Sequence, residues 1–351
     1  MIVFYIFIIN ITVMIKFISW MLLSVCVACI VGCATNTKVH EYPKAIGEVQ
    51  ILDDDAYGIL SDESTLEIID SGYIWTEGPL WLDEQSSLLF SDVAQNKIYQ
   101  WKEGRSSTVY LENAGLADSI EYVGKEPGSN GLLLNMDGQL IIAQHGNRQI
   151  AMMEAPVDTP VPKFKSLVNT YDGKRLNSPN DIIQDRAGNY YFTDPIFGLG
   201  MDQTPDLKHR GVYKLTKDNE LFLLVSDLEG PNGLGLSLDE KYLLVANTSK
   251  NKAILYEFEL DNTTNSIKNR KEIYDFSNEV KNGHGVLDGL TIDSNGNIYL
   301  TGPKGLWIFN KDYKPIARLI VPNAISNCTL SKDEKTLYLT NTDKILRWKL
   351  K

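Results

Sequence analysis

Beyond residue 64 the chain alternates short apolar runs with polar turns, and this pattern is repeated. The stretch NSPNDIIQDRAGNYYFTD (177–194) shows the unit: a polar pair, an apolar run, a polar turn and a second apolar run. Further runs such as KIYQWK, GVYKLT and AILYEFEL lie between the copies and alternate apolar with polar positions. Alternation with a period of two, bounded by turn residues, is typical of half-buried β-strands. The sequence therefore predicts an all-β protein.

Six copies of this unit can be aligned, and each begins with a polar residue that is usually followed by Gly or Asp. The six polar positions are Glu77, Asn130, Asn180, Asn232, Asp288 and Asn327. They are spaced by 50 to 56 residues, except for the last interval of 39 residues. Such intervals fit four strands per repeat, which is the period of a propeller blade. We therefore expect a six-bladed β-propeller over residues 64–351.

The last repeat is short and leaves room for only three strands before the sequence ends at KILRWKLK. The stretch STLEIID (64–70) precedes the first repeat and has the composition of a strand. We expect it to complete the sixth blade and so to close the ring.

Residues 1–33 form an apolar segment with one charge, Lys16, and they end in small residues before Cys33. This resembles a bacterial lipoprotein signal, with Cys33 as the lipidated first residue of the mature chain. An uncleaved membrane-spanning helix is the alternative, and Met14 is a possible start. We expect a protein exported from the cytoplasm and held at the cell envelope by lipid alone, facing the periplasm. The outer membrane is favoured because the residue after the cysteine is Ala34 and not the aspartate that is associated with retention in the inner membrane.

Residues 34–63 are polar and irregular and show no sustained period. They are predicted to be a flexible tether between the lipid and the propeller.

Cysteine usage and charge exclude several kinds of site. Cys328 is the only cysteine after Cys33, so we expect neither a disulfide framework nor a thiolate metal site, and its apolar surroundings favour a buried, inert thiol. The formal net charge of −11 argues against a nucleic-acid partner and is compatible with a cation site.

The repeat has a geometric consequence. The first strand of each blade lines the channel of a propeller, so the six polar positions should converge on its axis. A ring of two carboxylates and several amide oxygens suits a hard divalent cation such as Ca²⁺. Zinc fits less well, because the four histidines (His40, His145, His209 and His284) show no ligand spacing. Alternatively these residues only cap strand ends, which is the better interpretation for Asn327 and a reasonable one for Asn130.

Five motifs together resemble those of the SMP-30/gluconolactonase/LRE-like family, in particular its bacterial gluconolactonases. They are EGPLW at 77, AQHGNRQI at 143, GKRLNSPNDI with YFTDPIFGL from 173, GPNGLGLSLDEKYLLVAN at 230 and DGLTIDSNGNIY at 288. The resemblance implies a six-bladed propeller hydrolase in which the matching residues hold a catalytic calcium ion. Those residues are Glu77, Asn180, Asn232 and Asp288.

The resemblance also implies hydrolysis of a sugar lactone, with calcium polarising the carbonyl group. Asp288 is the candidate general base, and Asn180 and Asn130 are candidate substrate contacts. His145 could shuttle a proton near neutral pH or be fixed at a strand end. Arg148 could contact the substrate or form an ion pair.

His284, in a loop bordered by glycines four residues before Asp288, is a further candidate substrate contact. Asp92 and Asp194 end the second strand of their repeats, and we expect them to be turn carboxylates.

Two other functions stay open. One is a phosphotriesterase-like calcium hydrolase, because the axial residues do not distinguish a lactone from a phosphoryl group. The other is a tethered propeller that binds carbohydrate or protein without turnover, since fold does not determine function. For the enzyme we expect a small-molecule partner, the sugar lactone, and a monomer or weak homodimer.

Overall fold

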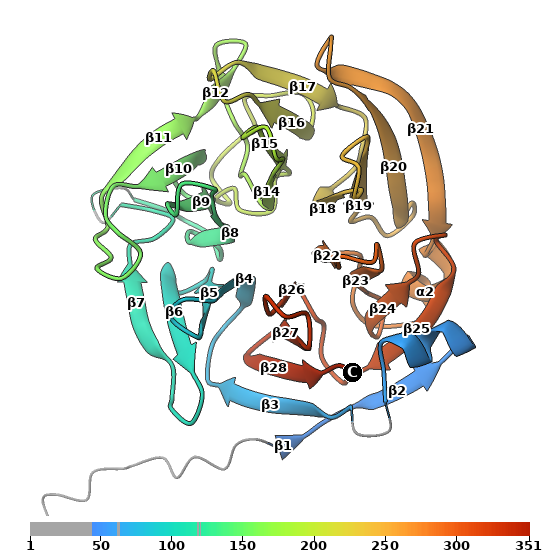
Figure 1. The fold of residues 1–351 in the computed structure, drawn as a ribbon. Helices are drawn as coiled ribbons and strands as arrows, with labels where there is room; N and C mark the ends of the chain where they lie inside the picture. The colour runs from blue at the N-terminus through green and yellow to red at the C-terminus, as the bar shows by residue number, and fades with distance from the viewer. Residues whose placement is uncertain (1–43, 62–63, 118, 120) are drawn as a thin grey trace, which may run out of the picture. The chain divides into compact units, whose positions relative to one another are not determined.

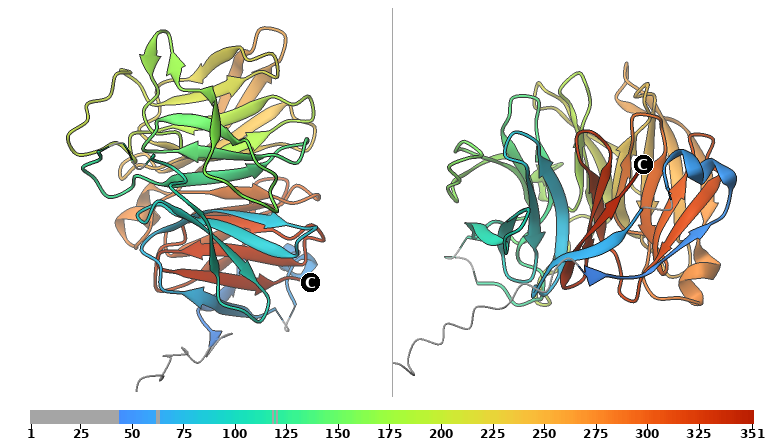
Figure 2. Two further views of the ribbon diagram at one scale, coloured as in Figure 1. Left: turned by 90° about the vertical axis from the view of Figure 1, so that its left-hand side faces the viewer. Right: turned by 60° about the horizontal axis from the view of Figure 1, so that its bottom comes forward.

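The computed structural model describes residues 44–61, 64–117, 119 and 121–351. This part of the chain forms six antiparallel sheets arranged radially around a central channel (Figure 1). Seen from the side, the sheets stand next to one another around the ring (Figure 2). The structure confirms the six-bladed β-propeller.

The blades follow one another along the chain, and in each the first strand lies nearest the channel. Blades 1 and 2 consist of β4 (Thr76–Leu82), β5 (Ser87–Asp92), β6 (Lys97–Lys102) and β7 (Thr108–Glu112), then β8 (Ser129–Leu134), β9 (Leu140–Gln144), β10 (Gln149–Met153) and β11 (Phe164–Val168). Blades 3 and 4 consist of β14 (Ile182–Gln184), β15 (Tyr190–Asp194), β16 (Gly211–Leu215) and β17 (Leu221–Val225), then β18 (Pro231–Leu236), β19 (Tyr242–Asn247), β20 (Ile254–Asp261) and β21 (Ser266–Asp275). Blade 5 contains β22 (Leu290–Ile292), β23 (Ile298–Gly302), β24 (Gly305–Phe309) and β25 (Pro315–Ile320). Blade 6 begins with β26 (Asn327–Leu330), β27 (Thr336–Asn341) and β28 (Lys344–Lys349).

Two small elements lie between blades. A hairpin of β12 (Thr170–Tyr171) and β13 (Lys174–Arg175) connects blades 2 and 3, and the one-turn helix α2 (Ser277–Lys281) connects blades 4 and 5. No helix in the described part of the chain is long and apolar enough to cross a membrane.

Blade 6 is closed by a strand from the N-terminal side, as expected. β3 (Leu66–Ser71) pairs antiparallel with β28, with Ser71 opposite Lys344 and Leu66 opposite Trp348. The short strand β1 (Lys44–Ala45) adds to the outer edge of β3. The ring is thus held shut by backbone hydrogen bonds between segments that are far apart in sequence.

The prediction of a flexible tether over residues 34–63 is wrong for residues 44–60. β2 (Glu48–Ile51) pairs with β25 as a fifth strand of blade 5, and the 3₁₀ turn η1 (Asp54–Gly58) follows it. Ala56 and Leu60 are buried in the hydrophobic core between blades 5 and 6. Residues 34–43 and the signal segment with Cys33 lie outside the described residues.

The misassignment has a physical reason. All four residues of β2 (EVQI) are exposed, so the short polar and apolar alternation of this strand does not mark a buried face. It is bound through its main-chain groups to the edge of a sheet, and such pairing places few demands on side chains.

The hydrophobic core is divided into layers between neighbouring blades. Between blades 3 and 4, for example, Tyr191 of β15 packs with Val245 of β19 and Tyr256 of β20. Full burial of a large apolar side chain stabilises a fold by about 1.5–3 kcal/mol. Because each layer belongs to two blades, no blade buries its own core alone.

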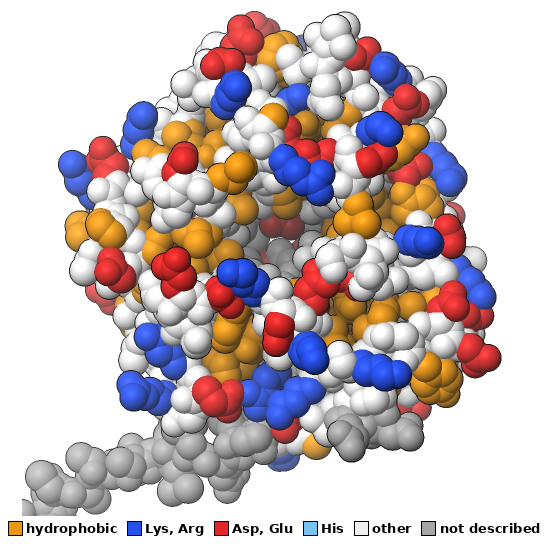
Figure 3. Space-filling view, viewed as in Figure 1, with side chains coloured by type: hydrophobic (Ala, Val, Ile, Leu, Met, Phe, Trp, Pro, Cys, Tyr) orange, Lys and Arg blue, Asp and Glu red, His pale blue; other side chains and the backbone are white. Residues whose placement is uncertain are grey.

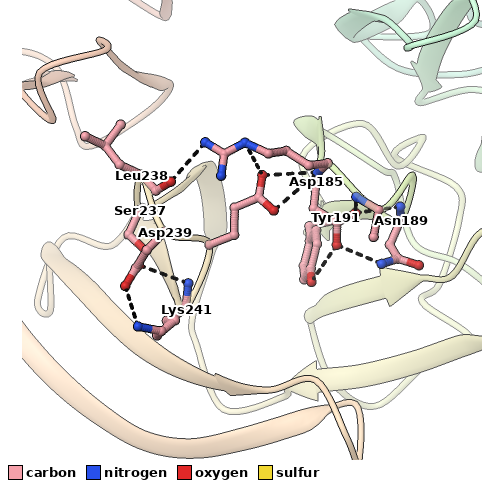
Figure 4. Close-up of polar contacts among 10 residues, drawn as sticks. Asp185, Asn189, Tyr191, Ser237, Leu238, Asp239 and Lys241 are labelled. Carbon is pink, nitrogen blue, oxygen red and sulfur yellow. Dashed lines mark hydrogen bonds and ion pairs between the residues drawn. The ribbon is translucent and has the colours of Figure 1, made fainter.

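Polar turns also join neighbouring blades. In blade 3 the Asp185 carboxylate accepts hydrogen bonds from the main-chain amides of Ala187 (3.0 Å) and Asn189 (2.8 Å) and from the Tyr191 hydroxyl (3.3 Å) (Figure 4). The amide of Arg186, in the same turn, donates to Glu240 of blade 4 (3.1 Å). The same arrangement recurs between blades 5 and 6, where Ser294 and Glu334 are the joining residues.

Candidate metal centre and active site

The polar positions selected by aligning the repeats lie together at the channel, where main-chain hydrogen bonds join neighbouring inner strands. The amide of Gly131 donates to the carbonyl oxygen of Asn180 (2.8 Å), and the amide of Gly233 donates to that of Asp288 (3.0 Å). Each bond links the start of one inner strand to the equivalent point of the next blade. The inner strands are therefore held in a fixed relation to one another.

Glycine follows these polar residues because the inner strands approach so closely. A Cβ atom at Gly78, whose φ is +48°, would lie 2.1 Å from the carbonyl oxygen of Asn130. A Cβ at Gly233 would lie 2.4 Å from the carbonyl oxygen of Asp288. The Glu-Gly, Asn-Gly and Asp-Gly pairs of the sequence are thus explained by the narrow channel.

Three carboxylates share the channel. Glu77 is 3% exposed, and Trp75 donates from its indole nitrogen to Glu77 Oε1 (3.4 Å). Burial, followed by the proximity of Asp181 and Glu126, raises the pKa of Glu77 to about 8. The pKa of Asp288 is raised well above its usual range by burial and then by Glu77. Figure 3 shows acidic side chains inside the central hollow.

Amide oxygens complete the donor set. Asn130 Oδ1 and Asn232 Oδ1 are buried and have no hydrogen-bond partner among the described residues. The Asn232 amide nitrogen donates to Thr248 Oγ1 (3.0 Å), which leaves its oxygen available. Burying such an oxygen without a partner is costly, and a cation removes that cost.

These residues fit a hard divalent cation. In the described part of the chain no three His, Cys, Asp or Glu side chains form a metal site by themselves, so amide oxygens have to contribute. Carboxylate and amide oxygens together are the ligands that Ca²⁺ takes in proteins. Glu77, Asn180, Asn232 and Asp288 are the residues that could hold it.

Asp181 also lies in the channel. The alignment of the repeats did not select it, because it selected the preceding residue, Asn180. Asp181 is 9% exposed, and burial raises its pKa to about 7. Interaction with the Asn327 side chain offsets part of this rise in the pKa. Asp181 stands directly after Asn180, so the acidic second position of this repeat, where most others have glycine, was the available signal.

Asn327 caps its own strand, as the simpler interpretation predicted, but its side chain also interacts with Asp181, whereas Cys328 is buried as expected. Asn327 Oδ1 accepts a hydrogen bond from the amide of Cys328 (2.8 Å), which is a local cap. The Cys328 thiol is buried, donates to the carbonyl oxygen of Tyr299 (3.4 Å), and has a raised pKa because of burial. It is an inert core thiol.

A cavity of about 420 Å³ opens beside Asp288, and we call it the Asp288 cavity. It is lined by Asp288 together with Trp75, Lys250, Val280, Lys281, Gly283, Gly285, Val286, Ala324 and Ile325. Its volume is in the usual range for small-molecule sites. Asp288 is therefore one of the polar residues of the channel and also lines a cavity of substrate size.

Asp92 and Asp194 hold the loops that precede the inner strands, which agrees with their assignment as turn carboxylates. Asp92 accepts hydrogen bonds from the amides of Ile74 (2.9 Å) and Trp75 (3.3 Å), and so fixes a residue of the Asp288 cavity. Asp194 accepts a hydrogen bond from the amide of Asn177 (2.8 Å).

His145 does not match the predicted proton shuttle. Its ring is completely buried, and its Nδ1 lies 3.9 Å from Glu126 Oε2. Burial lowers its pKa to about 4, so the imidazole is neutral across the pH range in which a shuttle would have to exchange protons. The side chain has a packing role against Gly198, where a Cβ would lie 2.1 Å from its Cγ.

Arg148 forms an ion pair, which was the alternative to a substrate contact, although its side chain is buried and not exposed. It is 4% exposed, and its Nε donates to the carbonyl oxygens of Leu176 (2.6 Å) and Asn177 (3.1 Å). Its Nη2 pairs with Asp206 (3.0 Å) in the loop between β15 and β16. The guanidinium group ties blade 2 to blade 3.

His284 is likewise bound elsewhere than expected. Its Nε2 lies 2.9 Å from the carbonyl oxygen of Val321, and it does not line the Asp288 cavity, whereas its neighbours Gly283 and Gly285 do. The loop that contains it thus borders the site through its backbone. Sequence reasoning missed Glu126, Lys250 and Lys281, because the first two lie in irregular loops and Lys281 ends the one-turn helix α2, all outside the repeated strands.

The fold and the site define a class of protein: a six-bladed propeller with carboxylates and amide oxygens around one end of its channel. The chain belongs to the SMP-30/gluconolactonase/LRE-like family, whose model matches residues 75–343. It is 32% identical over 338 residues to a gluconolactonase of Zymomonas mobilis, a match that covers 92% of both chains. It is 26% identical over 271 residues to a regucalcin of Danio rerio, covering 76% of this chain and 82% of the relative.

Among solved structures, a gluconolactonase of Xanthomonas campestris has a similar fold. It superposes with a TM-score of 0.76 at 27% sequence identity, and the match covers 89% of this chain and 99% of that one. Relatives of these kinds support a lactone-hydrolysing enzyme within the family.

Proposed function

We propose that this protein is a calcium-dependent lactonase that opens a sugar lactone. The observation that carries the proposal is the pairing of buried, unpartnered amide oxygens, such as Asn232 Oδ1, with carboxylates whose pKa values are raised. An arrangement of this kind is costly without a cation and is stabilised by one. The similarity to gluconolactonases supports the choice of substrate class.

Glu77, Asn180, Asn232 and Asp288 would hold the ion. When bound, it would supply Lewis-acid polarisation of the lactone carbonyl group and stabilisation of the developing oxyanion. Calcium is favoured over softer metals because every donor in the set is an oxygen atom.

Asp288 is the residue best placed to move a proton. It belongs to the axial group and also lines the Asp288 cavity, where a substrate and a water molecule would meet. Its carboxylate would accept a proton from the water as the water oxygen attacks the lactone carbonyl carbon. The ring C–O bond then breaks, and the ring oxygen receives the proton to give the hydroxy acid.

Trp75 would help to orient the sugar. Its side chain lines the cavity, and its indole nitrogen donates to Glu77. Because Asp92 holds its backbone, the ring offers a fixed apolar face to the C–H groups of a sugar.

The test is acid release from glucono-1,5-lactone above the spontaneous rate, measured with calcium, with chelator and with Asp288→Asn. The protein from Tyr42 to Lys351 forms one compact unit and is suitable. We expect activity that needs calcium and falls at least 100-fold in the variant. A protein that calcium stabilises but that hydrolyses no lactone would contradict the proposal. A phosphotriester assayed in parallel separates the alternative hydrolase.

We also propose that the protein is exported and anchored by lipid at Cys33, on the strength of the sequence of residues 1–33. Cys33→Ser should abolish incorporation of labelled fatty acid and release the protein from the membrane fraction. Incorporation that persists in this variant would rule out the anchor.

A further inference from the structure

Two lysines line the Asp288 cavity, and they come from different loops. Lys250 follows β19 in blade 4, and Lys281 ends helix α2. Both side chains are exposed, and neither forms an ion pair or a hydrogen bond with any residue that the structure describes. Two unpaired cations therefore border one substrate-sized cavity.

The other residues that line the cavity do not neutralise these two charges. The remaining side chains are apolar (Trp75, Val280, Val286, Ala324 and Ile325), and the only acid among the lining residues is Asp288. Lys281 interacts electrostatically with Asp275, but this acid lies outside the cavity lining, and its pKa is lowered mainly by hydrogen bonds from Ser277. The cavity is thus acidic at the channel and basic where the two loops border it.

This polarity is unusual in a chain with a formal net charge of −11. A neutral sugar lactone has no group that would use two ammonium ions, whereas an ionised acid group would be attracted to both. Asp288 and the two lysines line the same cavity, so one small molecule can contact all three.

We propose that the preferred substrate is a lactone that carries a second, ionised acid group, a carboxylate or a phosphate, remote from the lactone carbonyl. Lys250 and Lys281 bind this group and so determine specificity, while the lactone carbonyl lies toward Asp288. This inference rests on the proposed lactonase function.

The experiment compares two lactones with the same ring, D-glucono-1,4-lactone and D-glucaro-1,4-lactone. They differ only in a terminal CH₂OH against a carboxylate. We expect the native protein to show at least a tenfold higher kcat/KM for the charged lactone, declining as salt is added. The double variant Lys250→Gln/Lys281→Gln should lose this preference, mainly through a higher KM for the charged lactone.

Lys163→Gln is the matched control, because Lys163 is an exposed lysine of the same charge that does not line the cavity. It should keep the preference. A 6-phosphogluconolactone arm distinguishes the two sources of the anion: a preference for it that depends on the lysines, without one for the glucarolactone, assigns the site to phosphate.

Equal kcat/KM values for the charged and neutral lactones, with no effect of the double variant, would overturn this inference and leave the lactonase function intact. If neither lactone is hydrolysed, the proposed function fails instead. In that case calorimetry with D-glucarate and D-gluconate still tests the anion site. Glucarate should bind the native protein at least tenfold more tightly than it binds the double variant, and equal binding would refute the lysine site.

Discussion

The main-chain amide of Gly233 donates a hydrogen bond to the carbonyl oxygen of Asp288 (3.0 Å) across the boundary between blades 4 and 5. The residue that follows a proposed metal ligand of one blade thereby fixes the backbone of a ligand in the next. The geometry of the candidate metal centre is consequently a property of the packed ring and not of any single blade.

Gly233→Ala should therefore disturb Asp288 without touching its side chain. The new Cβ would lie 2.4 Å from the Asp288 carbonyl oxygen, so one of the two strands has to shift. We expect at least a tenfold loss of lactonase activity and a lower melting temperature. Gly58→Ala is the control, because no heavy atom lies within 4 Å of its Cβ position. A Gly233→Ala protein with native activity and stability would contradict the close approach of the strands.

Glu77→Gln should weaken the stabilisation of the fold by calcium. The amide keeps the shape of the side chain but removes one of the two proposed carboxylate ligands. Calcium should then raise the melting temperature much less than in the native protein, and activity should fall by about 100-fold. Glu84→Gln, on an exposed turn of blade 1, should leave both unchanged. Thermal unfolding with and without calcium provides the readout.

The stability of the metal-free protein should decrease with rising pH. The pKa of Glu77 in the folded protein is about 8, above its ordinary value of 4.5, so folding favours the protonated form. Its contribution to stability is complete below the ordinary pKa and is lost as the pH rises through about 8. Calcium competes with these protons, so its stabilising effect should grow over the same range.

Melting temperatures in chelator and in calcium, from pH 5 to pH 9, check both trends. A metal-free protein whose stability is constant or increases up to pH 8 would show that the axial carboxylates are not held in the protonated form.

Leu60→Ala should destabilise the whole propeller, although Leu60 lies in a segment that resembles a linker. Its side chain is 3% exposed in the core that contains Trp348, and removing such a side chain costs about 2–5 kcal/mol. Leu52→Ala, at a position that is 41% exposed, should have little effect. Urea unfolding measures the difference, and equal stabilities would place residues 44–60 outside the cooperative unit.

Arg148→Gln should separate a structural role from substrate binding. The guanidinium group satisfies two main-chain carbonyl oxygens and Asp206, so its loss should lower the free energy of unfolding. The KM of the folded variant should stay close to the native value. A large rise in KM at unchanged stability would restore Arg148 as a substrate contact.

The six blades were predictable because each repeat carries its own signal. A polar residue, a glycine and two alternating apolar runs recur at a nearly constant interval, and the inner strands must then meet. The closing strand β3 was predictable by counting, since the sixth repeat lacked one strand. Glu77, Asn232 and Asp288 were selected by phase alone and lie where the phase placed them.

What the sequence did not reveal depends on contacts without a period. β2 is held by its backbone, and an alternation of only four residues, all of them exposed, does not distinguish it from a linker. Lys250 lies in a loop and Lys281 ends helix α2, and the positions of both connections follow from the ring and not from local spacing. Arg148 and His145 looked functional because they are polar residues near a strand end, and only the structure shows that Arg148 joins two blades by hydrogen bonds and that the His145 ring is buried.

The pairing of β3 with β28 has a consequence for the folding of the protein during its synthesis. A chain synthesised from its N-terminus exposes β2 and β3 long before their partners β25 and β28 have been made. Both segments must wait, unpaired, until nearly the entire polypeptide is available, and only then can the circle be completed. Closure of the ring is therefore a late event, and the nascent chain cannot complete it until nearly all of its residues have been synthesised.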